Sequence, residues 1–112
     1  MSNIIDFSVI DGLKEIGDQE FLEELINIFL TQSEDIMADI ISSSEQQNAQ
    51  GVNKAAHKLK GSCLNLGANQ MSELCQIIES SSQQGDLSNI ETNVNELKRL
   101  HKETCAELKK LI

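Results

Sequence analysis

The chain has 112 residues, a length that suits one domain with a single hydrophobic core. Hydrophobic residues make up 39% and charged residues 24%, which excludes a disordered polymer, and the absence of Pro, Trp and Tyr argues against β-sandwiches and barrels and favours helices. The net charge of −9 excludes general binding to nucleic acid phosphates or to anionic lipid.

The beginning of the chain predicts a short helix and no targeting signal. The segment from Met1 to Asp6 lacks the basic and apolar regions of a signal peptide. Asp6 is a suitable N-cap for a brief helix over residues 6–15. The longest apolar stretch, Leu25 to Leu30, is far too short to cross a bilayer, so we expect a cytoplasmic protein.

Four longer segments follow, each with apolar residues at the three-to-four spacing of an amphipathic helix. They span residues 18–44, 49–66, 69–83 and 87–111. Asp18 caps the first of them, whose apolar stripe is Phe21, Leu25, Ile28/Phe29, Ile36 and Ile40. Gly67 can take the left-handed conformation that ends the second. Together they predict an all-α fold: one domain over residues 1–112, an antiparallel up-down-up-down four-helix bundle with a short N-terminal helix.

The charge is unevenly distributed along the chain. Residues 1–45 hold 11 acids and one base, whereas the remainder holds 7 acids and 8 bases. The helix predicted over residues 49–66 contains no acid at all. Around His57 it places three bases: Lys54, Lys58 and Lys60. An acidic protein with one locally basic stretch needs an explanation for that stretch.

The solvent-facing side of the same helix groups three residues that are unusual together. With Leu59 at the centre of the buried face, His57 falls about 160° away. Gly61 follows one turn later, although glycine inside a helix costs about 1 kcal/mol relative to alanine, and Leu64 adds exposed apolar area. This stripe fits a nucleophilic histidine with room for an anionic group and a docked partner. An exposed histidine near lysines more often has no function, so the residues alone leave both interpretations open.

A longer run resembles the signature of histidine-containing phosphotransfer (HPt) domains. The residues from His57 to Ala68 read HKLKGSCLNLGA, which is similar to the family pattern His-x-Leu-Lys-Gly-Ser followed by Leu-Gly-Ala. The family continues with a Leu/Met…Cys…Glu stretch, and here the next helix has Met71, Leu74, Cys75 and Glu79. The resemblance covers about residues 7–84 and implies a phosphorelay intermediate that passes a phosphoryl group between receiver-domain aspartates.

The resemblance also implies a role for each matching residue. His57 is expected to be the phospho-acceptor, and Lys60 to neutralise the phosphoryl oxygens. Glu79 is expected to accept a hydrogen bond from the inner ring nitrogen of His57 and so to orient the ring. Lys54 and Lys58 are expected to supply only supporting charge.

Partners and cofactors follow from the same resemblance. A response-regulator receiver domain with a phospho-aspartate is expected to dock over Gly61 and Leu64, and a hybrid sensor histidine kinase is expected as a further partner. We expect a monomer that binds no nucleic acid and no membrane, and no metal or cofactor in this chain, since the Mg²⁺ belongs to the receiver. The glycines are scattered singly, so we expect no nucleotide site and no autonomous kinase activity.

The remaining candidates have simpler interpretations. His101 lies in the apolar seam of the last predicted helix and is expected to pack there. Cys63 and Cys75 fall on core faces of adjacent helices and are expected to face each other, and with Cys105 they are interpreted as reduced, buried thiols. Two alternatives stay open: a helical adaptor that docks a receiver-like partner on the same surface without being phosphorylated, and a module of a larger sensor kinase.

Overall fold

The computed structural model describes residues 4–112, which form five helices that follow the predicted segments. The helices are α1 (Phe7–Ile16), α2 (Gln19–Glu45), α3 (Ala49–Leu66), α4 (Asn69–Gln83) and α5 (Ile90–Lys109). The expectation of no signal peptide rests partly on Met1, Ser2 and Asn3, which lie outside the described residues. None of the helices in the described part combines the length and the apolar composition needed to span a membrane.

Side-chain caps explain where the first three helices begin. The carboxylate of Asp6 accepts a hydrogen bond from the backbone N–H of Ser8 at 3.0 Å, and that of Asp18 accepts one from Phe21 at 2.9 Å. The Asn48 side chain caps α3 by accepting from Gly51 at 3.1 Å. Each cap satisfies a backbone donor that has no partner within its helix.

The start of α5 differs from the sequence prediction by three residues. The carboxylate of Asp86 accepts hydrogen bonds from both the backbone N–H and the hydroxyl of Ser88, at 3.0 and 2.7 Å. This local turn keeps Leu87 outside the helix, which begins only at Ile90. The predicted helix started too early because Leu87 fits the apolar spacing of α5 but lies in the turn before it.

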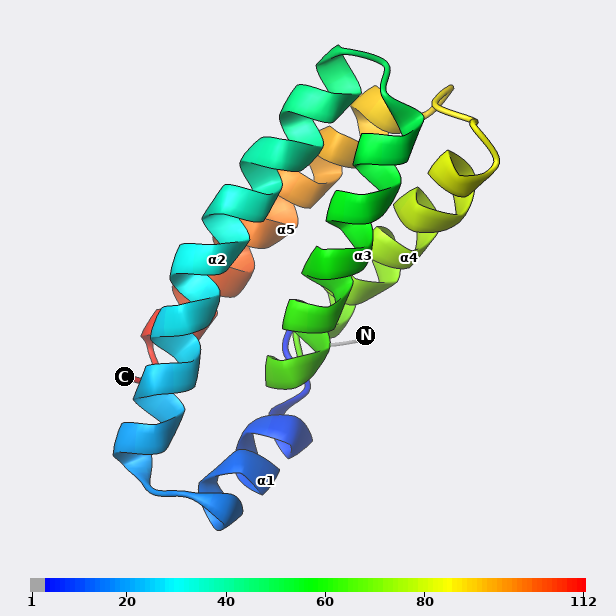
Figure 1. Cartoon of the computed structure of the whole chain (residues 1–112). Helices are drawn as coiled ribbons and strands as arrows, with labels where there is room; N and C mark the ends of the chain where they lie inside the picture. The colour runs from blue at the N-terminus through cyan, green and yellow to red at the C-terminus, as the bar shows by residue number, and fades with distance from the viewer. Residues whose placement is uncertain (1–3) are drawn as a thin grey trace.

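The four long helices form a four-helix bundle, as predicted. Helix α2 neighbours α3 and α5, helix α4 neighbours the same two, and within the described residues no Cα atoms of diagonally opposite helices lie within 8 Å of each other. Figure 1 shows these helices side by side, with α1 lying across the end of the bundle where α2 begins and α3 ends. This arrangement leaves one side of α3 and the adjoining side of α4 open to solvent, and His57 lies on that side.

The core of α2 lies one residue away from the predicted stripe in its first half. The predicted Phe21 and Leu25 are only partly buried and Ile28 is 47% exposed, whereas Leu22 and Ile26 are fully buried. From Phe29 onward the predicted residues are in the core: Phe29, Ile36 and Ile40. The early part of α2 has apolar residues on two adjacent stripes, and packing against the other helices selects one of them.

The leader before α1 is part of the core and packs against the turn between α3 and α4. The side chain of Ile5 is fully buried, and the backbone N–H of Asp6 donates to the carbonyl of Gly67 at 2.7 Å. Gly67 has φ 75°, the left-handed conformation that the sequence predicted for the end of α3. A Cβ atom at this position would lie 2.7 Å from the carbonyl oxygen of Asp6.

We expect Gly67→Ala to lower the free energy of unfolding by more than about 2 kcal/mol. The substitution combines the cost of a left-handed alanine, roughly 1–2 kcal/mol, with a clash against backbone that cannot turn aside. Gly85 has nearly the same φ, 74°, but open space around its Cβ position, so Gly85→Ala isolates the conformational cost. Urea unfolding of both variants measures the difference between their free energies of unfolding. Equal losses of free energy would show that the contact between Gly67 and the leader does not contribute to stability.

Candidate functional site

His57 lies on the open side of α3, near the middle of the helix. Its side chain is 68% exposed, whereas Ala56 and Leu59, on the opposite side of α3, are fully buried. This is the placement that the helical spacing of the sequence predicts. An exposed imidazole in a rigid helix is accessible to another macromolecule without any opening of the bundle.

Glu79 of α4 joins His57 to Lys60. Its Oε2 atom lies 2.6 Å from Nδ1 of His57, and its Oε1 atom accepts a hydrogen bond from Nζ of Lys60, also at 2.6 Å. The Lys60 side chain is 22% exposed and that of Glu79 is 16% exposed, so both are partly shielded from water. The hydrogen bond from Lys60, and after it the one from His57, hold the pKa of the Glu79 carboxyl below its ordinary value, although partial burial acts in the opposite direction.

The charge of Glu79 decides which ring nitrogen of His57 carries the proton. A carboxylate with a lowered pKa is ionised at neutral pH and can only accept hydrogen bonds. Nδ1 of His57 therefore donates to Glu79, and in the neutral form of the ring the lone pair is on Nε2. Within residues 4–112 we find no hydrogen-bond partner for Nε2. The site thus presents a nucleophilic nitrogen to solvent.

Asn53, which the sequence did not single out, fixes the backbone of Glu79. It lies one turn before His57 on α3, and its side-chain Nδ2 donates to the Glu79 carbonyl oxygen across the helix interface at 2.8 Å. The hydroxyl of Ser82 donates to the same carbonyl at 3.1 Å. The bond from Asn53 joins the two helices and holds the turn of α4 that carries Glu79 beside α3, so that the Glu79 carboxylate reaches both His57 and Lys60.

Gln76 is a second residue that the sequence analysis missed. Its Oε1 atom accepts a hydrogen bond from Nζ of Lys60 at 2.9 Å, so the ammonium has two acceptors on α4. The available signal was its spacing, three residues before Glu79, which places both on one face of α4. This spacing was not enough to identify Gln76, because it does not show which face of α4 lies against Lys60.

Gly61 and Leu64 extend the exposed surface on the same side of α3. A Cβ atom added at Gly61 would meet no atom within 4 Å, so nothing inside the described structure requires glycine there. The Leu64 side chain is 58% exposed. The two residues leave a low, partly apolar area beside His57, where another molecule can approach the helix closely.

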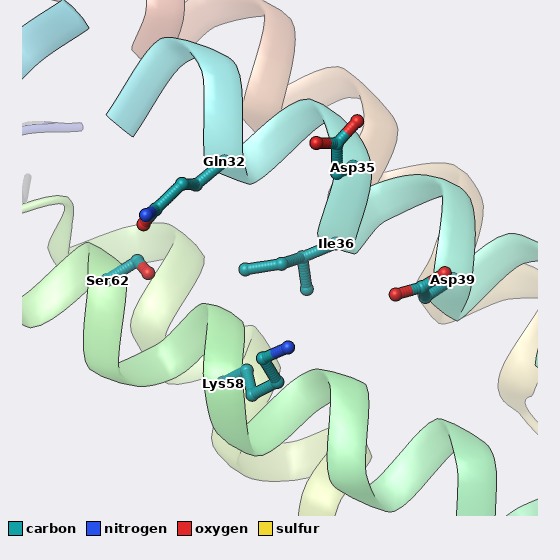
Figure 2. A pocket seen from close by; sticks show the side chains of 6 residues that line it. All are labelled: Gln32, Asp35, Ile36, Asp39, Lys58 and Ser62. Atoms are coloured by element: carbon teal, nitrogen blue, oxygen red, sulfur yellow. The ribbon is translucent and has the colours of Figure 1, made fainter. Parts of the chain in front are cut away.

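The other two lysines have different surroundings from Lys60. Lys54 and Lys58 are both exposed, and neither forms an ion pair within the described part of the chain. Figure 2 shows Lys58 pointing into the groove between α2 and α3, towards Ile36 and Asp39. Lys58 points this way because one residue turns the helix by 100° from His57, and the supporting charge expected from Lys54 and Lys58 stays a prediction.

The secondary candidates lie away from His57. His101 is half-buried, as predicted, and its Nε2 atom lies 2.8 Å from the hydroxyl of the buried Ser33. Burial lowers the pKa of His101, and Glu34 acts in the opposite direction. Cys63 and Cys75 are buried, and a hydrogen bond between the two thiols, with burial, raises the pKa of Cys63. Cys105 was expected to be buried but is only half-buried.

Metal ligation has no support in the described residues. Over residues 4–112 no group of three or more His, Cys, Asp or Glu side chains is arranged to hold a metal ion. The candidate functional site is the hydrogen-bonded group of His57, Lys60, Gln76 and Glu79 on the open side of α3 and α4.

Comparison with known proteins identifies related sequences and a related fold. The family model described as "Hpt domain" matches residues 24–110. The phosphorelay protein LuxU of Vibrio cholerae is 29% identical over 105 residues, which cover 93% of this chain and 92% of that protein. The crystal structure of histidine-containing phosphotransfer protein B of Pseudomonas aeruginosa PAO1 superposes with a TM-score of 0.91 at 23% identity, covering 98% of this chain and 95% of that one.

Two further relatives are longer than this chain. The phosphorelay intermediate protein YPD1 of Candida albicans is 26% identical over 80 residues, 70% of this chain and 44% of that protein. The pseudo histidine-containing phosphotransfer protein 1 of Oryza sativa subsp. japonica is 26% identical over 97 residues, 85% of this chain and 52% of that protein. The chain therefore spans about half the length of these two relatives.

Proposed function

The chain belongs to the Hpt domain family, and we propose that it is a phosphorelay intermediate that accepts a phosphoryl group on Nε2 of His57 from a receiver-domain aspartate and passes it to another. The observation that carries the proposal is the exposed ring of His57, whose Nδ1 is held by the same Glu79 carboxylate that binds Lys60, while Nε2 faces solvent. Two of the relatives are named as phosphorelay proteins, which supports the same function.

The transfer step follows from this geometry. The lone pair of Nε2 attacks the phosphorus of the aspartyl phosphate and forms the P–N bond, while the P–O bond breaks and its electrons leave on the aspartate carboxylate. The ring then carries a positive charge, which the carboxylate of Glu79 balances through the Nδ1–H hydrogen bond. Lys60 is bonded to the other oxygen of the Glu79 carboxylate, and from there its ammonium can bind an oxygen of the phosphoryl group. The reverse transfer uses the same groups.

The proposal extends to the setting of the reaction. The partners are receiver domains that supply the phospho-aspartate and bind the Mg²⁺ themselves, and a hybrid sensor histidine kinase stands upstream. This chain acts as a cytoplasmic monomer and does not phosphorylate itself from ATP. Its glycines occur singly, which supports the last point because phosphate-binding loops need several glycines together.

A labelling experiment tests the proposal directly. The protein is incubated with a receiver domain carrying a ³²P-labelled phospho-aspartate and Mg²⁺, and in a parallel sample with labelled ATP alone. We expect acid-labile, base-stable label on this chain in the first sample and none in the second. A chain that stays unlabelled with a panel of phosphorylated receivers contradicts the proposal.

The alternative is an adaptor that docks a receiver-like partner without taking the phosphoryl group. One relative carries the word "pseudo" in its name, which keeps this candidate in view. The adaptor would use the same surface around Gly61 and Leu64. The labelling experiment separates the two functions, because an adaptor binds the receiver and remains unlabelled.

We expect a bulky residue at Gly61 to block docking while the helix becomes more stable. Gly61→Ala should raise the free energy of unfolding by about 1 kcal/mol, because the Cβ meets nothing. Gly61→Tyr should raise the receiver concentration for half-maximal transfer by about tenfold or more, since the side chain fills the area beside His57.

Gly12 in α1 is the matched control for Gly61. It is also a helical glycine with open space around its Cβ position, but it lies outside the site. Gly12→Tyr should leave transfer unchanged, as measured by single-turnover kinetics over a range of receiver concentrations. Unchanged transfer in Gly61→Tyr would contradict the docking surface.

A further inference from the structure

Gln76 lies next to the proposed phosphoryl site, yet no step of the transfer described above uses it. We propose that Gln76 is a positioning residue for phosphoryl transfer, which with Ser80 holds the Lys60 ammonium beside His57 so that one N–H remains for the phosphoryl group. The inference rests on the proposed function of His57. It adds a residue that acts through Lys60 and does not touch the phosphoryl group itself.

The amide of Gln76 is held in one orientation. Its Nε2 atom donates to the hydroxyl of Ser80 at 2.9 Å, one turn further along α4, and its Oε1 atom accepts from Lys60 at 2.9 Å. The opposite orientation would place the NH₂ group against an ammonium, and both groups are donors. Ser80 therefore fixes the amide with its oxygen towards Lys60.

The number of donors on Lys60 makes this arrangement useful. An ammonium has three N–H groups, and Lys60 uses one for Gln76 and one for Glu79. The third has no partner within residues 4–112 and can bind an oxygen of the phosphoryl group. Lys60 can therefore keep both contacts on α4 during transfer, and its flexible side chain is ordered before the partner arrives.

The absence of charge on Gln76 also matters. The ammonium of Lys60 already faces one carboxylate, that of Glu79, at 2.6 Å. A second carboxylate at position 76 would anchor the lysine but would repel the incoming phosphoryl oxygens. A neutral acceptor holds Lys60 without cancelling the charge that the phosphoryl group needs.

A mutant cycle of single-turnover transfer tests this role, with the wild-type protein, Gln76→Met, Lys60→Met and the double variant. Methionine has a similar size and no amide acceptor. We expect Gln76→Met to lower the maximal transfer rate about tenfold, while the receiver concentration for half-maximal rate stays within about twofold. Because Gln76 acts through Lys60, the same substitution should change nothing further in the Lys60→Met protein.

Gln83→Met provides the control, since Gln83 is an exposed glutamine at the end of the same helix. It should transfer at the wild-type rate. An unchanged maximal rate in Gln76→Met, a loss confined to receiver affinity, or a full additional tenfold loss in the double variant would each overturn the inference. A wild-type protein that takes no label at all would instead overturn the proposed function, and this inference with it.

Discussion

The His57→Gln variant is expected to take up no phosphoryl group while remaining as stable as the wild-type protein. The amide nitrogen of glutamine has no lone pair available for attack on phosphorus, so the loss should exceed about 1,000-fold. The His57 side chain is 68% exposed, and its replacement should change the free energy of unfolding by less than about 1 kcal/mol. Labelling from a phosphorylated receiver and urea unfolding measure the two effects separately.

His101→Gln is the internal control for this experiment. His101 is half-buried and bonded to the buried Ser33, so its replacement should affect stability and leave phosphoryl uptake intact. The two variants are therefore expected to differ in opposite ways: His57→Gln loses phosphoryl uptake and keeps its stability, whereas His101→Gln keeps uptake and loses stability. A His57→Gln protein that is labelled as fully as the wild type, together with a His101→Gln protein that is not, would contradict the assignment.

The second large effect is expected for Lys60→Met, which should lower the maximal rate of transfer by about 100-fold or more. Lys60 shares the Glu79 carboxylate with His57, so its ammonium is held at the site where charge develops on the phosphoryl oxygens, and removing one such donor from a preorganised site typically has this effect. The substitution should also raise the pKa of the Glu79 carboxyl towards its ordinary value, because the hydrogen bond from Lys60 is the largest cause of its lowering. Single-turnover kinetics and an NMR titration of Glu79 check the two consequences.

Lys54→Met and Lys58→Met are matched controls that remove the same charge. Lys54 is exposed and Lys58 points into the groove towards α2 (Figure 2), and within the described residues neither forms a hydrogen bond or ion pair with Glu79 or His57. Water and salt screen the charges of such exposed ammonium groups. Each substitution should therefore reduce the transfer rate by less than about threefold. Equal losses in all three variants would mean that general positive charge, and not the position of Lys60, assists transfer.

The helices of this protein were predictable because their ends are marked by local signals. Asp6 and Asp18 cap helices through hydrogen bonds to neighbouring residues, and Gly67 ends α3 in a conformation that glycine adopts readily. The buried stripe of α2 was less predictable. Leu22 and Ile26 are in the core while Phe21 and Leu25 lie at its edge, and only packing against the neighbouring helices decides between such adjacent stripes.

Two features of the site could be predicted: the side of α3 on which His57 lies, and the contacts that the family motif implies. The spacing on α3 placed His57 in solvent, and the resemblance anticipated its contact with Glu79, which the structure has at 2.6 Å. Asn53 and Gln76 were missed because their contacts depend on the rotation and height of α4 relative to α3. The periodicity of a single sequence does not contain that information.

The most direct test of the account is to find which nitrogen carries the phosphoryl group. Protein labelled with ¹⁵N is phosphorylated by a receiver domain, and the ring nitrogens and their coupling to ³¹P are recorded by NMR. We predict a single phosphorylated ring, that of His57, with phosphorus on Nε2 and the proton still on Nδ1 beside Glu79. Phosphorus on Nδ1 of His57, or on His101, would contradict it.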